Sequence, residues 1–361
     1  MYIPFGGGIL YRKITAFLLI ITTLLTLCSC FGGEEIHKLD VELTGDLNVH
    51  FIDVGQGDCT LLESDGKFVL IDAGEKEYEN TVCAYLKENG VKTIDYVIAT
   101  HPHSDHCGGL TMVIDTFDCK NFITVETDQR TNVWMSVLRA VDKNDVNYID
   151  AKVSDTYTFG ESQFEIMGPY GNDYGDNYNN YSVVIKASCG DTSFLFTGDA
   201  EALAESEMIE NGAELEADVL KVGHHGSSTS NSNAFLSAVR PKCAVISCGK
   251  DNEYGHPHKE ILNALKRRGT TVFRTDELST IIASSDKKQV RFYYKTTDKI
   301  SEQVMSDNSN KISYVGNKNS KKFHFADCDG AKSMNKSNKV EFDSREDAVS
   351  KGYTPCKTCK P

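Results

Sequence analysis

Residues 100–109 read THPHSDHCGG, which places three histidines and one aspartate within six positions: His101, His103, Asp105 and His106. Imidazole and carboxylate groups are good ligands for zinc, manganese and iron. In an extended segment, His101 and His103 point the same way, because side chains alternate along a strand. Asp105 and His106 lie just beyond and can turn toward a second position. The spacing therefore predicts one short loop that serves two adjacent cations.

The composition sets limits on what the rest of the chain can be. The 361 residues suffice for one large domain and a small one, and 40% hydrophobic with 25% charged residues is ordinary for a globular protein. A net charge of -14 argues against a general nucleic-acid coat protein, which would be basic.

The N-terminus has the pattern of an export signal. Arg12 and Lys13 precede ITAFLLIITTLLTL, an apolar run of 14 residues, which is short for a membrane span and typical of a secretory signal. It ends in LCSC, which resembles the lipobox of bacterial lipoproteins, with Cys30 as the lipidated residue. We predict a signal peptide at 1–29 and a tether at 30–45, so that a lipid holds the protein on the outer face of the bacterial cytoplasmic membrane. An uncleaved signal anchor or a buried helix are the alternatives.

The body alternates between strand-like and helix-like segments. Strand patterns open it, helices and strands then alternate, and polar groups repeatedly follow the ends of apolar strands, as in IDYVIAT before HPHSDH. This order favours an α/β fold with two sheets between helices. The predicted domain covers 46–296, and a polar stretch at 297–315 reads as a linker before a small module at 316–361.

Several motifs together resemble the metallo-β-lactamase fold. After HPHSDH come LFTGD, in which Asp199 ends a strand, and KVGHHGS with His224 and His225, while LIDAG with Asp72 stands before it. The resemblance implies a four-layer αββα sandwich that binds two divalent cations, zinc or manganese. It implies that His101, His103, Asp105 and His106 are ligands, that Asp199 bridges the cations, and that His224 or His225 completes the second position.

A closer resemblance is to the lactamase-like domain of ComEC-type competence proteins and their stand-alone relatives. It covers about residues 46–295 and rests on FIDVGQGDCTLLE, NNYSVV, LFTGDAE, VLKVGHHGSSTS and YGHPHKEIL. It implies a metal-dependent nuclease or phosphodiesterase, and some such relatives act on cell-wall phosphodiesters.

One departure from the wider superfamily concerns the first cation position. The sequence has no histidine between His106 and His224, and Asn180, Tyr181 and Ser182 occupy about the place of the usual third ligand. The first position would then be weaker, or open to a phosphate oxygen, and a one-metal enzyme is an alternative.

For several other residues near these motifs the sequence allows two roles. Asp58 and Asp72 are predicted to orient the ligand histidines, although Asp58 equally suits a turn. Ser227, Ser228 and Ser230 would hold phosphate or cap the next helix. The predicted catalytic groups are Asp105, His225 and His256, and His256 would protonate the leaving group or contact the substrate.

The C-terminal module carries its own metal pattern. His324 and Cys328 stand in an H-x-x-x-C spacing, Cys356 and Cys359 in a C-x-x-C, and four such ligands suit structural zinc. The module resembles the zinc-binding domain of the Ada DNA-repair protein, with His324 where that domain has its first cysteine, which argues against methyl acceptance. With 10 Lys and Arg against 6 Asp and Glu, the module would contact a polyanion such as DNA or teichoic acid, or serve only as a cap.

Together these patterns predict a surface-tethered, metal-dependent hydrolase of phosphodiesters, with DNA as the expected substrate. The alternatives are a DNA-binding accessory protein without hydrolytic activity, and a phosphodiesterase that acts on cell-wall polymers. No nucleotide cofactor is expected, and the sequence does not indicate the oligomeric state.

Overall fold

The structure is a computed structural model that describes residues 39, 41–296, 299–306, 313–326, 328–359 and 361. The predicted signal peptide, Cys30 and part of the predicted tether lie outside the described residues. In the part of the chain that is described, no helix combines the length and apolar character needed to cross a membrane.

The first sheet has nine strands in the order β16-β15-β14-β1-β2-β3-β4-β5-β6, of which β1–β6 come from the start of the body and β14–β16 from its end. Its strands are β1 (Leu47–Phe51), β2 (Thr60–Ser64), β3 (Lys67–Ile71), β4 (Thr93–Ile98), β5 (Asp118–Thr124), β6 (Asn147–Asp150), β14 (Ile281–Ser285), β15 (Val290–Thr296) and β16 (Lys299–Val304). Its helices are η1 (Lys76–Tyr78), α2 (Glu79–Glu88), α3 (Ser104–Cys107), α4 (Leu110–Thr116) and α5 (Asn132–Lys143). The pairs β3–β4, β4–β5 and β5–β6 are parallel, as expected where helices connect successive strands.

The second sheet has seven strands, all from the middle of the body, in the order β13-β12-β11-β10-β9-β8-β7. Its strands are β7 (Thr156–Phe159), β8 (Ser162–Gly168), β9 (Val184–Cys189), β10 (Thr192–Phe196), β11 (Val219–Lys221), β12 (Cys243–Ile246) and β13 (Thr271–Arg274). Its helices are η2 (Tyr178–Tyr181), α6 (Ala202–Glu210), η3 (Gly223–Gly226), α7 (Asn233–Val239), α8 (Lys259–Arg268) and α9 (Thr275–Leu278). From β10 to β13 the strands run parallel.

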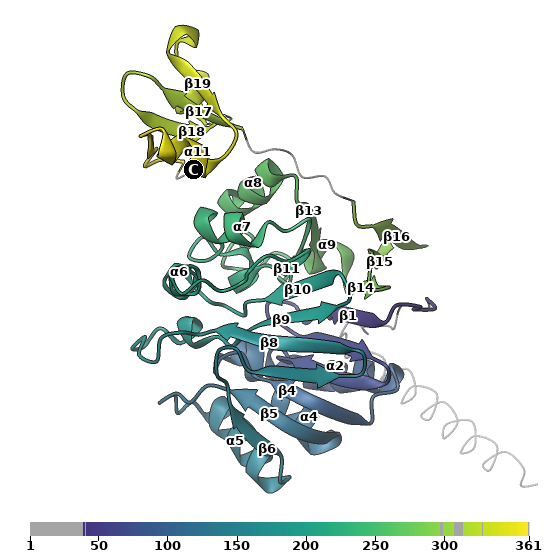
Figure 1. The fold of residues 1–361 in the computed structure, drawn as a ribbon. Coiled ribbons are helices and arrows are strands. Elements are labelled where there is room, and N and C mark those ends of the chain that lie inside the picture. The colour runs from purple at the N-terminus through teal and green to yellow at the C-terminus, as the bar shows by residue number, and fades with distance from the viewer. Residues whose placement is uncertain (1–38, 40, 297–298, 307–312, 327, 360) are drawn as a thin grey trace, which may run out of the picture. The chain divides into compact units, whose positions relative to one another are not determined.

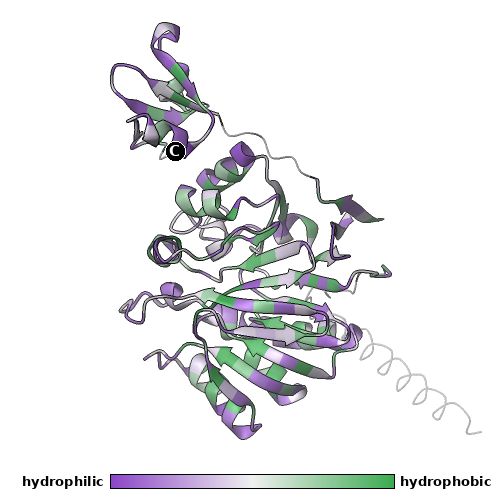
Figure 2. Cartoon of the chain, viewed as in Figure 1, coloured by the Kyte–Doolittle hydropathy of each residue, from purple (hydrophilic) through white to green (hydrophobic). Residues whose placement is uncertain are grey.

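The two sheets face each other across one apolar core. Phe51, Val69 and Ile98 of the first sheet belong to the same buried cluster as Phe164 and Phe194 of the second. A separate cluster joins the outer face of the second sheet to α6, α7 and α8, and Figure 1 shows α4 and α5 against the first sheet. Figure 2 shows hydrophobic residues concentrated in the strands and in the helix faces that meet them. The predicted four-layer α/β sandwich is therefore confirmed.

Parallel strands from both sheets deliver polar residues to one region. β3 leads into Asp72 and β4 into His101 in the first sheet, while β10 leads into Asp199 and β11 into His225 in the second. Loops beyond the carboxyl ends of parallel strands are where α/β proteins place their ligand sites, because the sheet fixes the origin of each loop.

Two edge strands have no counterpart in the sequence-based prediction. β7 and β16 lie at the ends of their sheets, and most of their residues are exposed or half-buried. β16 lies within the stretch 297–315 that was expected to be a linker, and it pairs with β15 of the body. An edge strand that covers little core needs no regular apolar alternation, so the sequence carries little trace of it.

The C-terminal module is a small four-stranded sheet in the order β19-β17-β18-β20. Its elements are β17 (Tyr314–Asn317), β18 (Lys322–Phe325), α10 (Asp329–Lys332), η4 (Lys336–Asn338), β19 (Lys339–Phe342), α11 (Arg345–Ser350) and β20 (Thr354–Pro355). Its core consists mainly of aromatic side chains, among them Phe323, Phe325 and Phe342. So small a core stabilises a fold only marginally, and a bound structural metal would add the stability that the core lacks.

Candidate metal centre

The histidine-rich loop starts where β4 ends. His101 is fully buried, and its Nε2 lies 2.9 Å from His103 Nδ1. His103 precedes α3, and Asp105 and His106 lie within that short helix. Gly57 of a neighbouring loop passes so close that a Cβ there would lie 2.4 Å from the Asp105 carbonyl oxygen, so a glycine is required. The loop thus packs closely against Gly57, and the ring nitrogens of His101 and His103 lie side by side.

Asp72 orients His106 from beneath the site. Its carboxylate accepts from the Thr100 backbone N–H at 2.9 Å, from the Thr100 hydroxyl at 2.7 Å and from His106 Nδ1 at 2.8 Å. With Nδ1 bonded to Asp72, His106 Nε2 faces Asp199 Oδ1 at 3.2 Å and is the ring atom available to a cation. Asp72 thus contacts the ring of His106, and its orienting role stays a prediction.

Asp199 lies at the centre of the cluster. Its Oδ1 is 3.2 Å from His106 Nε2, and its Oδ2 is 3.9 Å from His101 Nε2, 3.7 Å from His224 Nε2 and 3.8 Å from His225 Nε2. One ligand atom each from Asp105, His106, Asp199 and His225 lies within 4.8 Å of all the others. Both oxygens of Asp199 thus face ring nitrogens, as a bridge between two cations requires.

His224 and His225 form a tight turn after β11 in which both residues have positive φ, 51° and 53°. This left-handed conformation costs free energy for a residue with a side chain and is found mainly where function requires it. His225 is buried, with Nδ1 3.0 Å from the Ser247 carbonyl and Nε2 3.2 Å from Asp105. His224 is partly exposed and its Nδ1 is bonded to Thr229 at 3.0 Å. Of the two histidines, His225 is therefore the one whose ring nitrogen lies in the close group with Asp105, His106 and Asp199.

Asp58 contacts the site through a buried ion pair that the sequence reading missed. Lys221 of β11 donates to Asp58 Oδ2 at 2.7 Å, and Asp58 Oδ1 lies 3.3 Å from His225 Nδ1. The side chains of Lys221 and Asp58 are only 2% and 6% exposed. The pair joins a loop of the first sheet to a strand of the second beneath the ligand histidine. A lysine inside the apolar run ADVLKVG was the signal that could have revealed it.

A second support lies behind the histidine turn. Asn231 accepts from the Gly223 N–H at 3.1 Å and donates to the Gly223 carbonyl at 2.9 Å, which fixes the start of the turn. The buried Glu205 of α6 accepts from the backbone N–H groups of Asn231 and Ser232. Burial raises the pKa of Glu205 to about 7, although these N–H groups act against the rise. Sequence patterns gave no indication of this support.

The buried carboxylates of the cluster carry negative charge that protons on the histidines, or bound cations, must balance. Burial disfavours charge on Asp199, but His106 and His225 outweigh it and hold its pKa well below the usual range. Against the same burial, Asp199 and its neighbouring carboxylates raise the pKa of His106 well above normal and that of His225 to about 10. Metal ions replace such protons when they bind.

Two buried atoms at the centre fit a metal. Asp199 Oδ1 and His106 Nε2 are shielded from solvent, and neither makes a hydrogen bond of normal geometry. Unpartnered buried polar atoms are uncommon and need an explanation, which a bound cation supplies. The set of imidazole and carboxylate donors suits zinc or manganese.

A pocket of about 470 Å³ opens over the cluster. Its lining includes His103, Asp105, Asp199, His224, His225 and His256, together with the acidic residues Glu75, Glu77 and Glu253. An anionic substrate would be repelled from so acidic a pocket unless cations were bound.

His256 reaches the pocket from the loop before α8. Its ring lies 5.7 Å from that of His224 and stacks with that of His225 at 6.3 Å, and its buried Nδ1 has no hydrogen-bond partner. Burial, with the neighbouring histidines, lowers the pKa of His256 to about 4, so the ring is neutral at pH 7. The structure thus places His256 in the pocket, and the two roles that the sequence left open, substrate contact and proton donation, stay predictions.

Hydrogen bonds within the protein hold the serine-rich loop, Ser227–Ser230. Ser227 is bonded to Thr229, and the Ser228 N–H donates to His258 Nδ1 at 2.9 Å. The cap of α7 is Ser232, which accepts from the Phe235 N–H. None of the three serines singled out in the sequence therefore caps this helix.

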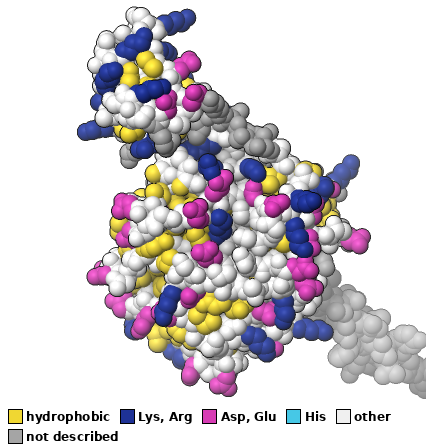
Figure 3. All heavy atoms as spheres, viewed as in Figure 1, with side chains coloured by type: hydrophobic (Ala, Val, Ile, Leu, Met, Phe, Trp, Pro, Cys, Tyr) yellow, Lys and Arg dark blue, Asp and Glu magenta, His cyan; other side chains and the backbone are white. Residues whose placement is uncertain are grey.

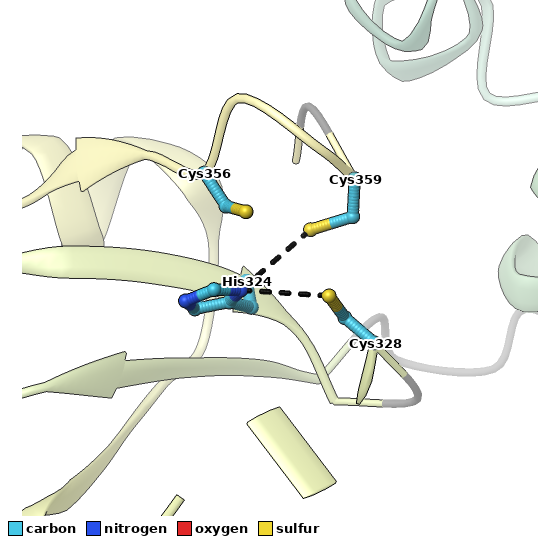
Figure 4. Close-up of side chains that lie close together, drawn as sticks. All are labelled: His324, Cys328, Cys356 and Cys359. Carbon is cyan, nitrogen blue, oxygen red and sulfur yellow. Dashed lines mark hydrogen bonds between the residues drawn. The ribbon is translucent and has the colours of Figure 1, made fainter. Parts of the chain in front are cut away.

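The C-terminal module brings together its four predicted ligands. Figure 4 shows His324 beside Cys328, Cys356 and Cys359, with Nδ1 3.5 Å from the sulfur of Cys328 and 3.9 Å from that of Cys359. One ligand atom from each lies within 4.8 Å of all the others. Gly330 leaves room for the ring, since a Cβ there would lie 2.7 Å from it. A closed set of one nitrogen and three sulfurs suits structural zinc.

Comparison with known proteins finds one family for the body and another for the C-terminal module. Residues 52–250 match the family described as the metallo-beta-lactamase superfamily. This chain belongs to the metallo-β-lactamase superfamily. Residues 303–361 match the family described as the metal binding domain of Ada. The predicted resemblances of the body and of the module are confirmed.

Relatives of this superfamily member include competence protein ComA of Neisseria gonorrhoeae, which is 29% identical over 228 residues, 62% of this chain and 30% of that protein. ComE operon protein 3 of Bacillus subtilis is 32% identical over 263 residues, which are 66% of this chain and 33% of that protein. Recombination protein 2 of Haemophilus influenzae is 32% identical over 232 residues, which are 63% of this chain and 27% of that protein. The chain thus spans about a third of the length of these relatives. The metallo-beta-lactamase fold protein YhfI of Bacillus subtilis aligns with 72% of this chain and 100% of its own, at 12% identity and a TM-score of 0.46.

Proposed function

We propose that this protein is a metal-dependent phosphodiesterase that acts on DNA at the cell surface, held there by a lipid on Cys30. The observation that carries the hydrolytic part is the convergence of Asp105, His106, Asp199 and His225 under an acidic pocket. Relatives named for competence and for recombination support DNA as the substrate.

When bound, divalent cations would lower the pKa of a water and neutralise charge on a phosphate. The protein residues provide the geometry. Asp72 and the Ser247 carbonyl hold the Nδ1 protons of His106 and His225, which directs both Nε2 atoms inward. Asp105 is the most exposed carboxylate of the set, with a side chain 28% exposed, and can accept a proton from the attacking water. The neutral His256 can donate one N–H to a phosphate oxygen.

The direct test is hydrolysis by the purified full chain in Mn²⁺ or Zn²⁺. Substrates are single- and double-stranded DNA and bis(p-nitrophenyl) phosphate, a small phosphodiester. His103→Ala and Asp199→Ala should each lower the rate by ~100-fold or more, because each removes a ligand. The control is Asp115→Ala, an exposed aspartate that pairs with Lys143 at 2.9 Å. Full activity in both ligand variants would refute catalysis at this centre, and no activity in the wild type would favour a binding role.

We further propose that the C-terminal module contacts the phosphate backbone of the substrate. Figure 3 shows Lys and Arg side chains over its visible face. Lys318, Lys321 and Lys322 are exposed around the β17–β18 turn, and Lys318 donates to the Ser337 carbonyl at 3.0 Å, which brings the exposed Lys336 into the same region.

The test replaces Lys318, Lys321, Lys322 and Lys336 with glutamine in the full chain. Affinity for DNA should fall and its salt dependence should flatten by ~0.9 per lost phosphate contact on double-stranded DNA. The rate on bis(p-nitrophenyl) phosphate should not change. Unaltered DNA affinity would show that the module serves only as a cap.

A further inference from the structure

The pocket over the candidate metal centre offers no basic side chain to a polyanion. Among the described residues that line it there is no Lys or Arg, and the acidic residues Glu75, Glu77 and Glu253 belong to the lining. Bound cations would neutralise the phosphate that is cut, but the phosphates beside it meet no positive side chain in this pocket. Further binding energy at the pocket must therefore come from neutral groups of the substrate.

Three rings form a column that runs from the mouth of the pocket to the metal centre. The ring of Tyr254 stacks on that of His256, with 5.6 Å between their centroids and 21° between their planes. His256 in turn stacks with the ligand candidate His225 at 6.3 Å and 27°. Tyr254 lines the pocket and is 61% exposed. His256 thus covers one face of the Tyr254 ring, and most of the rest of this side chain is open to solvent.

Hydrogen bonds hold the loop that carries Tyr254. The side chain of Asn252 donates to the Gly249 carbonyl at 2.9 Å and to the His256 carbonyl at 2.6 Å. It also accepts from the His256 N–H at 2.9 Å. The Gly249 N–H donates to Gln56, another residue of the pocket lining, at 3.1 Å. A ring held in this way loses little conformational entropy when a ligand binds, so its contact area contributes more fully to affinity.

A flat exposed ring in a pocket without positive side chains suits a nucleobase. Every base has a π-face, and bases of single strands stack on aromatic side chains whatever their sequence. Inside a duplex both faces of a base are covered by its neighbours, so that a protein reaches such a face only after the base leaves the stack. Polymers of sugar phosphate or glycerol phosphate have no flat aromatic group at all.

We propose that Tyr254 stacks on a nucleobase next to the phosphate that is cut and thereby selects single-stranded DNA. The inference rests on the proposed function in taking DNA as the substrate, and it adds the form of DNA and the residue that recognises it. Tyr254 extends the column of His225 and His256 outward by one ring, and the base extends it by one more.

The test uses a single strand of about four nucleotides that carries 2-aminopurine, because so short a strand fills one site. The fluorescence of 2-aminopurine falls when the base stacks on an aromatic ring. Phosphorothioate linkages keep the negative charge and resist hydrolysis. Binding to the full chain in Mn²⁺ should quench the fluorescence. An unlabelled strand should compete ~5-fold better or more than a strand of equal length without bases, the lower end of what one stacked base contributes.

Tyr254→Ala should abolish both the quenching and the preference over the base-free strand, whereas Tyr254→Phe keeps the ring and should retain both. The matched control is Tyr148→Ala, which should behave as the wild type. Tyr148 of β6 is also exposed, at 44%, but is not among the residues that line the pocket.

Equal competition by the two strands in the wild type, or undiminished quenching in Tyr254→Ala, would overturn the inference. Hydrolysis of natural single-stranded DNA, measured in parallel, separates the two claims. Quenching that depends on Tyr254 in a wild type that does not hydrolyse DNA contradicts the proposed function and leaves the stacking site standing. Hydrolysis of DNA without any preference for the base-containing strand contradicts the stacking site and leaves the proposed function standing.

Discussion

The buried pair of Lys221 and Asp58 gives the sharpest stability prediction. Lys221→Met removes the ammonium that lies 2.7 Å from Asp58 Oδ2 and leaves a carboxylate whose side chain is 6% exposed without its main counter-charge. Breaking a buried pair by removal of one partner costs ~3–5 kcal/mol. We therefore expect the free energy of unfolding to fall by about this amount in Lys221→Met.

The chain contains a matched exposed pair. Lys120 and Asp118 lie at the same 2.7 Å, but their side chains are 53% and 55% exposed. Exposed pairs contribute only ~0–1 kcal/mol, so Lys120→Met should change the unfolding free energy very little. Urea unfolding of the full chain at pH 7 and constant metal concentration measures both variants.

A double variant tests the physical reason for the loss. Adding Asp58→Asn to Lys221→Met removes the uncompensated charge and should recover ~1–3 kcal/mol, because the desolvated carboxylate is gone. Equal losses in Lys221→Met and Lys120→Met, or no recovery in the double variant, would refute the reasoning from burial.

Further predictions concern the ligands, the pH dependence and the module. Calorimetry should show that His225→Ala weakens Mn²⁺ binding to the full chain by ~10-fold or more and that His224→Ala weakens it much less. The reason is that, of the two, only His225 belongs to the close group of ligand atoms. A larger loss in His224→Ala would contradict His225 as the ligand. The pKa of Glu205 is raised to about 7 in the folded protein, so its contribution to stability is present below the unfolded pKa of ~4.3 and is lost as the pH rises through 7. The unfolding free energy should therefore fall by ~1–3 kcal/mol more between pH 5 and 8 in the wild type than in Glu205→Gln, and parallel pH profiles would exclude this. Cys356→Ser should release zinc from the C-terminal module and make it sensitive to proteolysis, since its core is small, while Cys243→Ser, a buried thiol of β12, should keep the zinc content.

Local patterns located the parts of the candidate centre that lie on the loops after strands, and the structure brings these residues together. HPHSDH and the aspartate of LFTGD each follow an apolar strand, and the parallel arrangement of such strands brings the loops together. Which of His224 and His225 turns inward depends on backbone φ values and on Ser247, 22 residues further along, so adjacent identical residues could not be told apart.

Two supporting residues show what could and what could not be predicted from the sequence. Lys221 was detectable in principle, because a charged residue within an apolar strand requires a partner. Glu205 was not, since it lies on an ordinary helix. The edge strand β16 was missed because it buries almost no apolar surface.

The most direct test of the account is a crystal structure of the full chain soaked in Mn²⁺, with anomalous diffraction at the manganese edge. The account predicts two peaks in the pocket that share Asp199. The first should be bounded by His101 and His103, and the second by Asp105, His106 and His225. An absence of anomalous density between these side chains, or a peak coordinated by other residues, would contradict the central claim that they form a metal centre.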